Sequence, residues 1–354
     1  MFSCFKSLAA AFALGGVLFS SPAVAAGKPV ELAFMGCYVE EHPAVASVWK
    51  PFFKAAEEAF AGQIAFRYFS ENMLYSNQAE AAQGISDGRA AFGCIRPSVH
   101  PDTYRLLGVI NVPGLVPNAV VGSLVLEDII AKFPAVRAEL PKNSTHFTSW
   151  TSAAYQIGTV EPVHTLAELK GRKIIVWDAV SHALVRELGA EPVRVSPADS
   201  YWTFKRGLAD GILCPLPPLR AYKLTEMVKH HLLLDAMVQG FVEEVNLKQW
   251  DAMPKDMKAW FRTEGGSRMA LALGRALENG VKADRAAMEA AGHAFCGVAE
   301  VDRPAFKSAL DTVTGRWKEH CRELDPKLVD AVLSYARERA AYHSAAFEAG
   351  KYER

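Results

Sequence analysis

Residues Leu169–Leu213 read LKGRKIIVWDAVSHALVRELGAEPVRVSPADSYWTFKRGLADGIL and alternate between strand and helix patterns. Ile174–Trp177 is a short apolar run, and apolar residues at helical spacing follow it until Gly189. Pro192–Val195 and Ile212–Leu216 read as two further strands, with a helical pattern between them. Strands that alternate with helices in this way predict a βαβαβ unit with a parallel sheet.

The helix between the last two strands carries its own start signal. Ser196 offers a hydroxyl at the N-cap, Pro197 suits the first helical position, and Asp199 lies near the positive end of the helix dipole. Tyr201 and Phe204 continue the pattern at helical spacing. We therefore expect this helix to begin directly after Ser196.

The N-terminal half of the chain repeats the same alternation. Its first expected helix, at about residues 44–60, contains Pro51, which should kink it. Further elements are expected as strands at Glu31–Met35, Ile64–Phe69, Ala90–Ile95 and Tyr155–Thr159, and as a helix around Gln78–Ile85. A chain of 354 residues exceeds the length of ~250–300 residues at which one core usually divides. We predict an α/β protein with two lobes, each a mainly parallel sheet flanked by helices.

The C-terminal third is predicted to be largely helical. Pro254–Gly292 has helical character interrupted at Gly265 and Gly266, which indicates either a bend in one helix or a break between two. Leu328–Glu348 reads as a last helix with one apolar side, which should pack on the outside of the molecule.

The N-terminus has the pattern of a secretory signal peptide. Lys6 precedes the apolar run Leu8–Phe19, and Ala23-Val24-Ala25 forms a small-x-small cleavage site, so residues 1–25 are the expected leader. The apolar run is shorter than the ~20 residues that a transmembrane helix needs. The mature protein is therefore expected to be exported as a soluble chain.

Cysteine usage leaves at least one thiol unpaired in the mature chain. Of the six cysteines, Cys4 lies in the expected leader, so five remain. Cys296 and Cys321 flank a helical region and are the candidate pair for a disulfide. The others lie in apolar strands, where we expect free cysteines that behave as small hydrophobic residues, namely Cys37, Cys94 and Cys214.

The sequence shows no sign of an enzyme, a metal site or a nucleic-acid partner. The 39 basic residues balance the 39 acidic residues, so nothing favours nucleic acid or a membrane surface. The run Gly84–Gly88 matches GxSxG, but a helix precedes it and a strand follows, the reverse of a nucleophile elbow. His230 and His231 are adjacent rather than four residues apart. We expect no catalytic residue, no cofactor and no metal.

Several short motifs carry a family resemblance. LKGRKI at residue 169, the LGAEPV turn at residue 188 and the Tyr201…Gly207…Asp210-Gly211 spacing resemble the solute-binding proteins of tripartite ATP-independent periplasmic (TRAP) transporters, the DctP-like family. LAFMGCYVEEHP at residue 32 and VNLKQWDAMP at residue 245 resemble two further segments of that family. The resemblance covers essentially the whole mature chain.

The resemblance implies a periplasmic binding protein with a long spine helix that crosses both lobes. Lobe I would span residues 26–152, completed by about 240–280, and lobe II residues 153–239, completed by about 281–354. Such a protein captures a small metabolite between its lobes and delivers it to a membrane permease with a small and a large subunit, driven by an ion gradient. We expect a periplasmic monomer.

The chain departs from the family at the residues that usually bind the ligand carboxylate. The arginine that most relatives carry in the strand after LKG falls on Ile175, and a second family arginine falls on Tyr155. An asparagine that some relatives use falls on Cys214. The expected ligand is therefore a small organic acid bound in another way, or an aromatic or amine compound.

Ligands of such folds bind at the carboxyl ends of parallel strands, so the candidate site residues lie there. They are Tyr38, Arg96, Trp150, Tyr155, Trp177, Asp178 and Cys214. The aromatic rings could stack on a ligand or belong to the core.

Arg96 and two acids have alternative roles. Arg96 either replaces the missing carboxylate clamp from the first lobe or pairs with a surface acid such as Asp102 or Glu80. Glu40 or Asp178 would suit an ammonium group. For the whole protein, the alternatives to transport are a receptor read by a signalling partner and a secreted enzyme.

Overall fold

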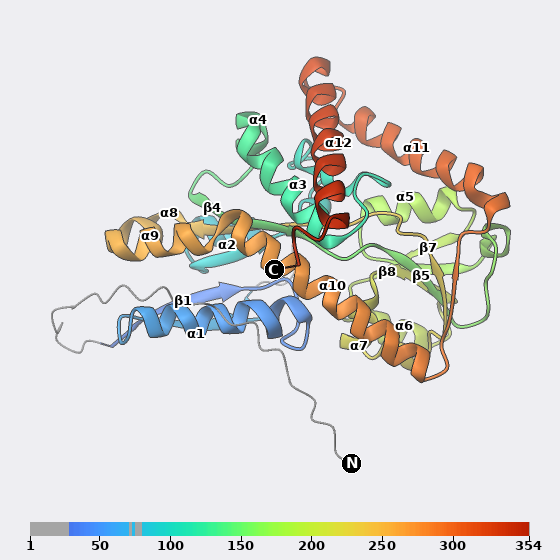
Figure 1. The fold of residues 1–354 in the computed structure, drawn as a ribbon, viewed down its shortest axis with the longest axis horizontal. Coiled ribbons are helices and arrows are strands. Elements are labelled where there is room, and N and C mark those ends of the chain that lie inside the picture. The colour runs from blue at the N-terminus through green and yellow to red at the C-terminus, as the bar shows by residue number, and fades with distance from the viewer. Residues whose placement is uncertain (1–27, 71–72, 75–79, 354) are drawn as a thin grey trace, which may run out of the picture.

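The computed structural model describes residues 28–70, 73–74 and 80–353. The expected signal peptide at residues 1–25 and the start of the helix expected around Gln78–Ile85 lie outside the described residues. The described chain forms two sheets flanked by helices, which define a first and a second lobe (Figure 1). Within the described part of the chain, no helix has both the length and the apolar character to cross a membrane.

The first sheet has the strand order β2-β1-β3-β10-β4. β1 pairs in parallel with β2 and β3, whereas β10 is antiparallel to β3 and β4. A strand from late in the chain therefore lies between two early ones. The strands are β1 (Val30–Met35), β2 (Ile64–Phe69), β3 (Phe92–Ile95), β4 (Ser144–Thr151) and β10 (Gly240–Asn246).

The second sheet has the order β11-β9-β5-β8-β6-β7 and contains the predicted βαβαβ unit. β6 is parallel to β7 and β8, while β5 is antiparallel to β8 and β9. Its strands are β5 (Gln156–Thr159), β6 (Lys173–Val176), β7 (Glu191–Arg194), β8 (Gly211–Cys214), β9 (His230–Leu233) and β11 (Ala294–Gly297).

Two crossing segments connect the sheets side by side. Residues 152–155 lead from β4 to β5, and residues 234–239 lead back from β9 to β10. The Ser152 amide donates to the Gln239 carbonyl at 2.8 Å, and the Tyr155 amide donates to the Met237 carbonyl at 2.8 Å. The paired backbones form a narrow connection of the kind about which two lobes can rotate.

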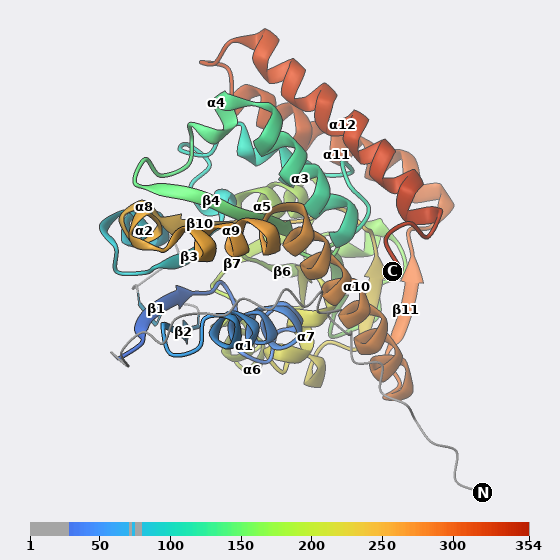
Figure 2. The same cartoon turned by 60° about the vertical axis from the view of Figure 1, so that its left-hand side comes forward.

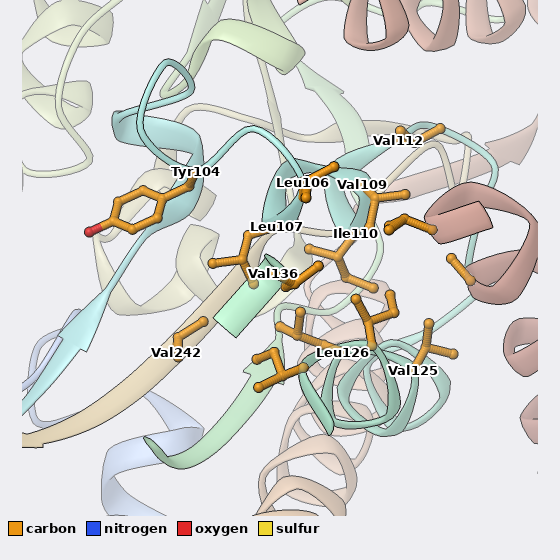
Figure 3. Close-up of a cluster of buried hydrophobic side chains, with 14 of the residues drawn as sticks. Tyr104, Leu106, Leu107, Val109, Ile110, Val112, Val125, Leu126, Val136 and Val242 are labelled. Carbon is orange, nitrogen blue, oxygen red and sulfur yellow. The ribbon is translucent and has the colours of Figure 1, made fainter. Parts of the chain in front are cut away.

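Helices of the first lobe pack around a core centred on α3 (Ala119–Lys132), which is apolar on nearly all sides and buried (Figure 3). The expected helix at 44–60 is divided into a π-helical turn, η1 (Val45–Trp49), and α1 (Lys50–Ala59), with Pro51 in the first turn of α1. The others are α2 (Ala81–Asp87), η3 (Pro97–Val99), η4 (Leu107–Asn111) and α4 (Pro134–Arg137).

In the second lobe the predicted helix start at Ser196 is wrong. α6 spans Ser200–Lys205, and the Ser196 hydroxyl instead donates to Asp199 at 2.6 Å within a preceding turn. The Ser196 hydroxyl also accepts the Asp199 backbone amide at 3.1 Å, so its hydrogen bonds close the turn that precedes α6. The remaining elements are η5 (Leu166–Leu169), α5 (Ala179–Glu187), α7 (Leu216–Ala221) and η6 (Leu224–Glu226).

The C-terminal helices cross both lobes. The glycine pair separates α9 (Lys255–Glu264) from the long helix α10 (Gly266–Ala290), because Gly266 adopts a φ of +55°. α10 contacts α3 and β4 in the first lobe and α7 in the second, as expected for a spine helix (Figure 1). The others are α8 (Leu247–Ala252), η7 (Glu300–Asp302), α11 (Arg303–His320) and α12 (Pro326–Glu348).

The last helix returns to the first lobe. α12 packs against α3 (Figure 2), whereas we expected residues 281–354 to complete the second lobe. Val332 and Ala336 of α12 are fully buried in the core that also contains α3. The apolar side of α12 therefore covers an outer face of the first lobe.

The disulfide joins a different pair of cysteines from the expected one. Cys37, which follows β1, is bonded to Cys94 of β3, with 5.8 Å between their Cα atoms. Cys296 and Cys321 are both free, as is the buried Cys214. The expectation failed because β1 and β3 are neighbours in the sheet although their cysteines are 57 residues apart in the chain.

Candidate functional site

Five of the predicted site residues lie together where the strand ends of the two sheets meet. Tyr38 and Arg96 come from the first lobe, and Tyr155, Asp178 and Cys214 from the second. All five are buried, with exposed fractions between 0% for Asp178 and 5% for Arg96.

Burial and charged groups of both lobes act on Tyr155. Burial raises the pKa of Tyr155 well above its usual value. The charge of Asp178 and then that of Tyr38 raise this pKa further, Arg96 lowers it, and Cys214 adds a smaller rise. Because such effects fall off with distance, Tyr155 lies within reach of charged groups from both lobes.

Gln239 joins the two lobes within this cluster. Its side-chain oxygen accepts a hydrogen bond from Arg96 Nη2 at 3.0 Å and one from the Tyr155 hydroxyl at 3.2 Å. Its side-chain nitrogen donates to the Ser98 hydroxyl, and its backbone amide donates to the Ser152 hydroxyl at 3.0 Å. Sequence reasoning missed Gln239, although a polar residue between Val238 and the strand Gly240–Asn246 was a signal that could have found it.

Arg96 is held inside the molecule. Among the described residues it is the only arginine or lysine that is buried. Its guanidinium carbon lies 6.0 Å from the centre of the Phe241 ring. Asp102, one of the two surface acids considered as its partner, instead lies 3.3 Å from the Nε2 atom of His320. A buried cation destabilises the fold unless polar groups surround it, and the side-chain oxygen of Gln239 is one such group beside Arg96.

Asp178 caps helix α5 with one carboxylate oxygen and leaves the other without a partner. Oδ1 accepts the backbone amides of Val180 and Ser181, both at 2.9 Å, and Ser181 completes a capping box. Oδ2 is buried and accepts no hydrogen bond from any of the described residues. Oδ2 is therefore an acceptor held in a fixed orientation just after the carboxyl end of β6.

Trp177 and Cys214 are part of the second-lobe core. Trp177 is 7% exposed, and its indole nitrogen donates to the Ser200 hydroxyl at 3.0 Å. Both residues belong to the same buried apolar cluster as Ile175. Burial also raises the pKa of the Cys214 thiol well above its usual value, so this side chain is uncharged.

The aromatic residues of the first lobe stack on one another. Trp150 stacks on Phe241 with 4.2 Å between ring centres, and its indole nitrogen donates to Glu243 at 3.1 Å. Tyr38 stacks on His42 at 3.8 Å. Burial lowers the pKa of His42 to about 3, so this stack pairs two neutral rings.

A cavity of about 340 Å³ lies between the lobes, and none of the seven predicted site residues lines it. Its wall includes Pro97 and Ser98, which follow Arg96, and Ala179 and Val180, which follow Asp178. Val112, Val313 and Trp317 add further apolar surface. The volume is in the range of small-molecule pockets.

Glu40 is not part of the cluster. It is half-exposed and forms an ion pair with Lys50 at 2.7 Å. The described residues include no group of three or more His, Cys, Asp or Glu side chains placed to hold a metal ion.

Comparison with known proteins agrees with this architecture. Residues 36–320 match the model of the DctP family, described as bacterial extracellular solute-binding protein, family 7. The chain belongs to this family. Its fold and family are those of binding proteins rather than enzymes.

The relatives of the chain are distant in sequence and similar in fold. It is 23% identical over 302 residues to the C4-dicarboxylate-binding periplasmic protein DctP of Rhodobacter capsulatus, covering 83% of this chain and 87% of that protein. A TRAP solute-binding protein from Rhodoferax ferrireducens, solved with copurified benzoate, has a TM-score of 0.82 at 21% identity, covering 90% of this chain and 99% of that one. One from Bordetella bronchiseptica with bound (R)- and (S)-mandelate has a TM-score of 0.78 at 19% identity, covering 89% and 99%.

Proposed function

We propose that this protein is a periplasmic receptor that encloses a small organic acid between its lobes and delivers it to a TRAP-type permease. The observation that carries the proposal is the Arg96–Gln239–Tyr155 network. It brings a buried cation from the first lobe to the strand ends of the second, at the segments that connect the lobes.

Arg96 takes over the role of carboxylate anchor. Ile175, at the position of the usual family arginine, is completely buried in the apolar core of the second lobe and offers no donor. The guanidinium of Arg96 hydrogen-bonds Gln239, and it is a planar group whose N–H donors match the shape of a carboxylate. A planar guanidinium binds a carboxylate through two parallel hydrogen bonds, which are strong when buried.

The ligand class is a small acid with one carboxylate at Arg96. Two structures with similar folds were solved with benzoate and with mandelate, both aromatic monocarboxylates. The apolar cavity beside Arg96 suits the remainder of such a molecule.

Ligand capture follows from contacts to both lobes. A ligand favours the closed arrangement only through its higher affinity for that arrangement. The spine helix already contacts both lobes closely at one point: a Cβ atom on Gly280 would lie 2.9 Å from Pro43 of the first lobe and 3.7 Å from Pro217 of the second. The closed arrangement would be the form that the permease recognises.

The test is a binding experiment with the mature protein. Calorimetry with benzoate, mandelate and succinate, each compared with its amide, should show binding of acids alone. Arg96→Ala should weaken binding about 10- to 100-fold, because a charge-assisted buried bond is lost. Arg322→Ala is the matched control, since Arg322 lies at the surface paired with Glu319.

Two results would overturn this proposal. Unchanged affinity in Arg96→Ala would remove Arg96 from the site. Failure of the protein to stimulate uptake of its ligand by membrane vesicles that contain its permease would remove the transport role.

A further inference from the structure

We propose that the ligand is an α-amino acid with an apolar side chain, whose ammonium group binds Asp178 while its carboxylate binds Arg96. This inference rests on the proposed function and names the ligand class of the same site. It extends beyond the acids named for the similar structures, because neither benzoate nor mandelate carries an ammonium group.

The free oxygen of Asp178 is the first observation. Oδ1 is held by two backbone amides, so the carboxylate plane is fixed, and the buried Oδ2 accepts nothing from the described residues. A buried carboxylate oxygen without a hydrogen bond is costly. A ligand N–H group would remove that cost.

The donors around Asp178 are already used elsewhere. The Tyr155 hydroxyl donates to Gln239, and the Trp177 indole nitrogen donates to Ser200. The Ser181 hydroxyl donates to the backbone carbonyl of Asp178 rather than to its side chain. A ligand N–H group would supply the donor that these residues do not.

The charges of the site match a zwitterion. Arg96 belongs to the first lobe and Asp178 to the second, and the residues that directly follow them, Pro97 and Ala179, line the same cavity. A simple carboxylate would satisfy Arg96 but would place a second negative charge near Asp178. An α-amino acid satisfies both, and its two charged groups then hold both lobes in the closed arrangement.

The interlobe cavity provides for the side chain. Pro97 follows Arg96 and Val180 lies close after Asp178, and both line the same cavity of about 340 Å³. The wall is mainly apolar, with Ala183 and Val313 as further members. This surface favours an apolar side chain over a charged one.

Three compounds with one carbon skeleton test the inference. Phenylalanine, 3-phenyllactate and 3-phenylpropionate differ only in carrying an ammonium, a hydroxyl or a hydrogen at the α-carbon. Calorimetry with the full mature protein should show phenylalanine binding about 10- to 100-fold more tightly than 3-phenylpropionate, because it adds a charge-assisted bond. Phenyllactate should fall between them.

Asp178→Asn is the matched variant. Asparagine is as good an N-cap as aspartate, so the melting temperature without ligand should be unchanged. Its neutral side chain should abolish the preference for phenylalanine over phenyllactate. A retained preference in Asp178→Asn would overturn the role of Asp178.

The outcomes separate this inference from the proposed function. If 3-phenylpropionate and phenyllactate bind and phenylalanine does not, the amino-acid inference is wrong and the organic-acid receptor stands. If none of the three binds, and benzoate, mandelate and succinate also fail, the proposed function fails with it. The wild-type comparison decides the matter even if the variant does not fold.

Discussion

In the first lobe the site residues follow two segments that a disulfide joins. In the second lobe, hydrogen bonds at helix and strand ends hold the site residues. Tyr38 directly follows Cys37, and Arg96 lies two residues after Cys94, which is bonded to Cys37. In the second lobe Asp178 caps α5, and the nearby thiol of Cys214 is free. The first lobe thus presents a rigid cation, and the second presents an anion whose position depends on local capping.

The largest expected effect tests whether Trp177 belongs to the second-lobe core. Trp177→Ala should lower the free energy of unfolding by about 3–5 kcal/mol, because it leaves a cavity in a packed cluster. Urea denaturation measures this change in the free energy of unfolding. Trp177→Phe, which keeps a ring but loses the bond to Ser200, should cost about 1 kcal/mol. Weak binding at unchanged stability in Trp177→Ala would instead mark a ligand contact.

Removing the disulfide should break the contrast between the lobes. The double variant Cys37→Ala, Cys94→Ala should lose about 2–5 kcal/mol of unfolding free energy, because the crosslink no longer restricts the unfolded chain. Ligand affinity should fall as well, since Tyr38 and Arg96 lose their common support. Denaturant titration and calorimetry measure the two effects. Cys296→Ser, at a free thiol of the second lobe, is the control, and equal losses in both variants would contradict the comparison.

Glu243 gives the first lobe a dependence on pH. Burial raises the pKa of Glu243 to about 8, against the opposing effect of the Trp150 N–H. Between the unfolded pKa near 4.5 and the folded value near 8, the folded state holds a proton that the unfolded state releases. Stability from this group is therefore present at low pH and falls by roughly 1 kcal/mol per pH unit as pH rises through that window.

Glu243→Gln should remove this contribution. The difference in melting temperature between the variant and the wild type should grow in favour of the variant from pH 5 to pH 8. His42 acts in the opposite direction in both proteins, since burial lowers its pKa to about 3 and stability is lost as pH falls below about 6.5. A difference that does not change with pH would show that Glu243 is ionised in the folded protein.

The smallest expected effect concerns the cap of the second lobe. Ser181→Ala removes half of the capping box and should cost about 1 kcal/mol of unfolding free energy. Because the cap orients Asp178, the affinity for phenylalanine should fall more than that for 3-phenylpropionate. Calorimetry on both ligands checks this, with Ser308→Ala on an exposed part of α11 as the control. Equal losses of affinity for the two ligands would show that the cap does not orient Asp178 toward the ligand.

Sequence patterns predicted the elements that depend on neighbours in the chain. The strands of the βαβαβ unit were placed within two residues because hydrophobic periodicity and glycine stops are local signals. Arg96 and Asp178 were found because strand ends can be located from sequence. Their roles as ligand anchors stay a prediction.

Features that depend on contacts between distant segments were missed. The Cys37–Cys94 bond needed the knowledge that β1 and β3 are adjacent, and Gln239 needed the path of the segments between the lobes. Trp177 precedes a polar residue, which favoured a ligand contact over a core position, yet it belongs to a buried apolar cluster and donates to Ser200. No local pattern distinguishes these cases, because the deciding partner lies far along the chain.

The position of β10 has a consequence for synthesis. The first sheet lacks an internal strand until residues 240–246 have joined β3 and β4, so the lobe that begins the chain cannot be completed before β5–β9 of the second lobe have been made. Until then the edges of β3 and β4 that face β10 remain open to incorrect pairing. During synthesis the N-terminal lobe therefore waits for a strand from the second half of the chain before its sheet is complete.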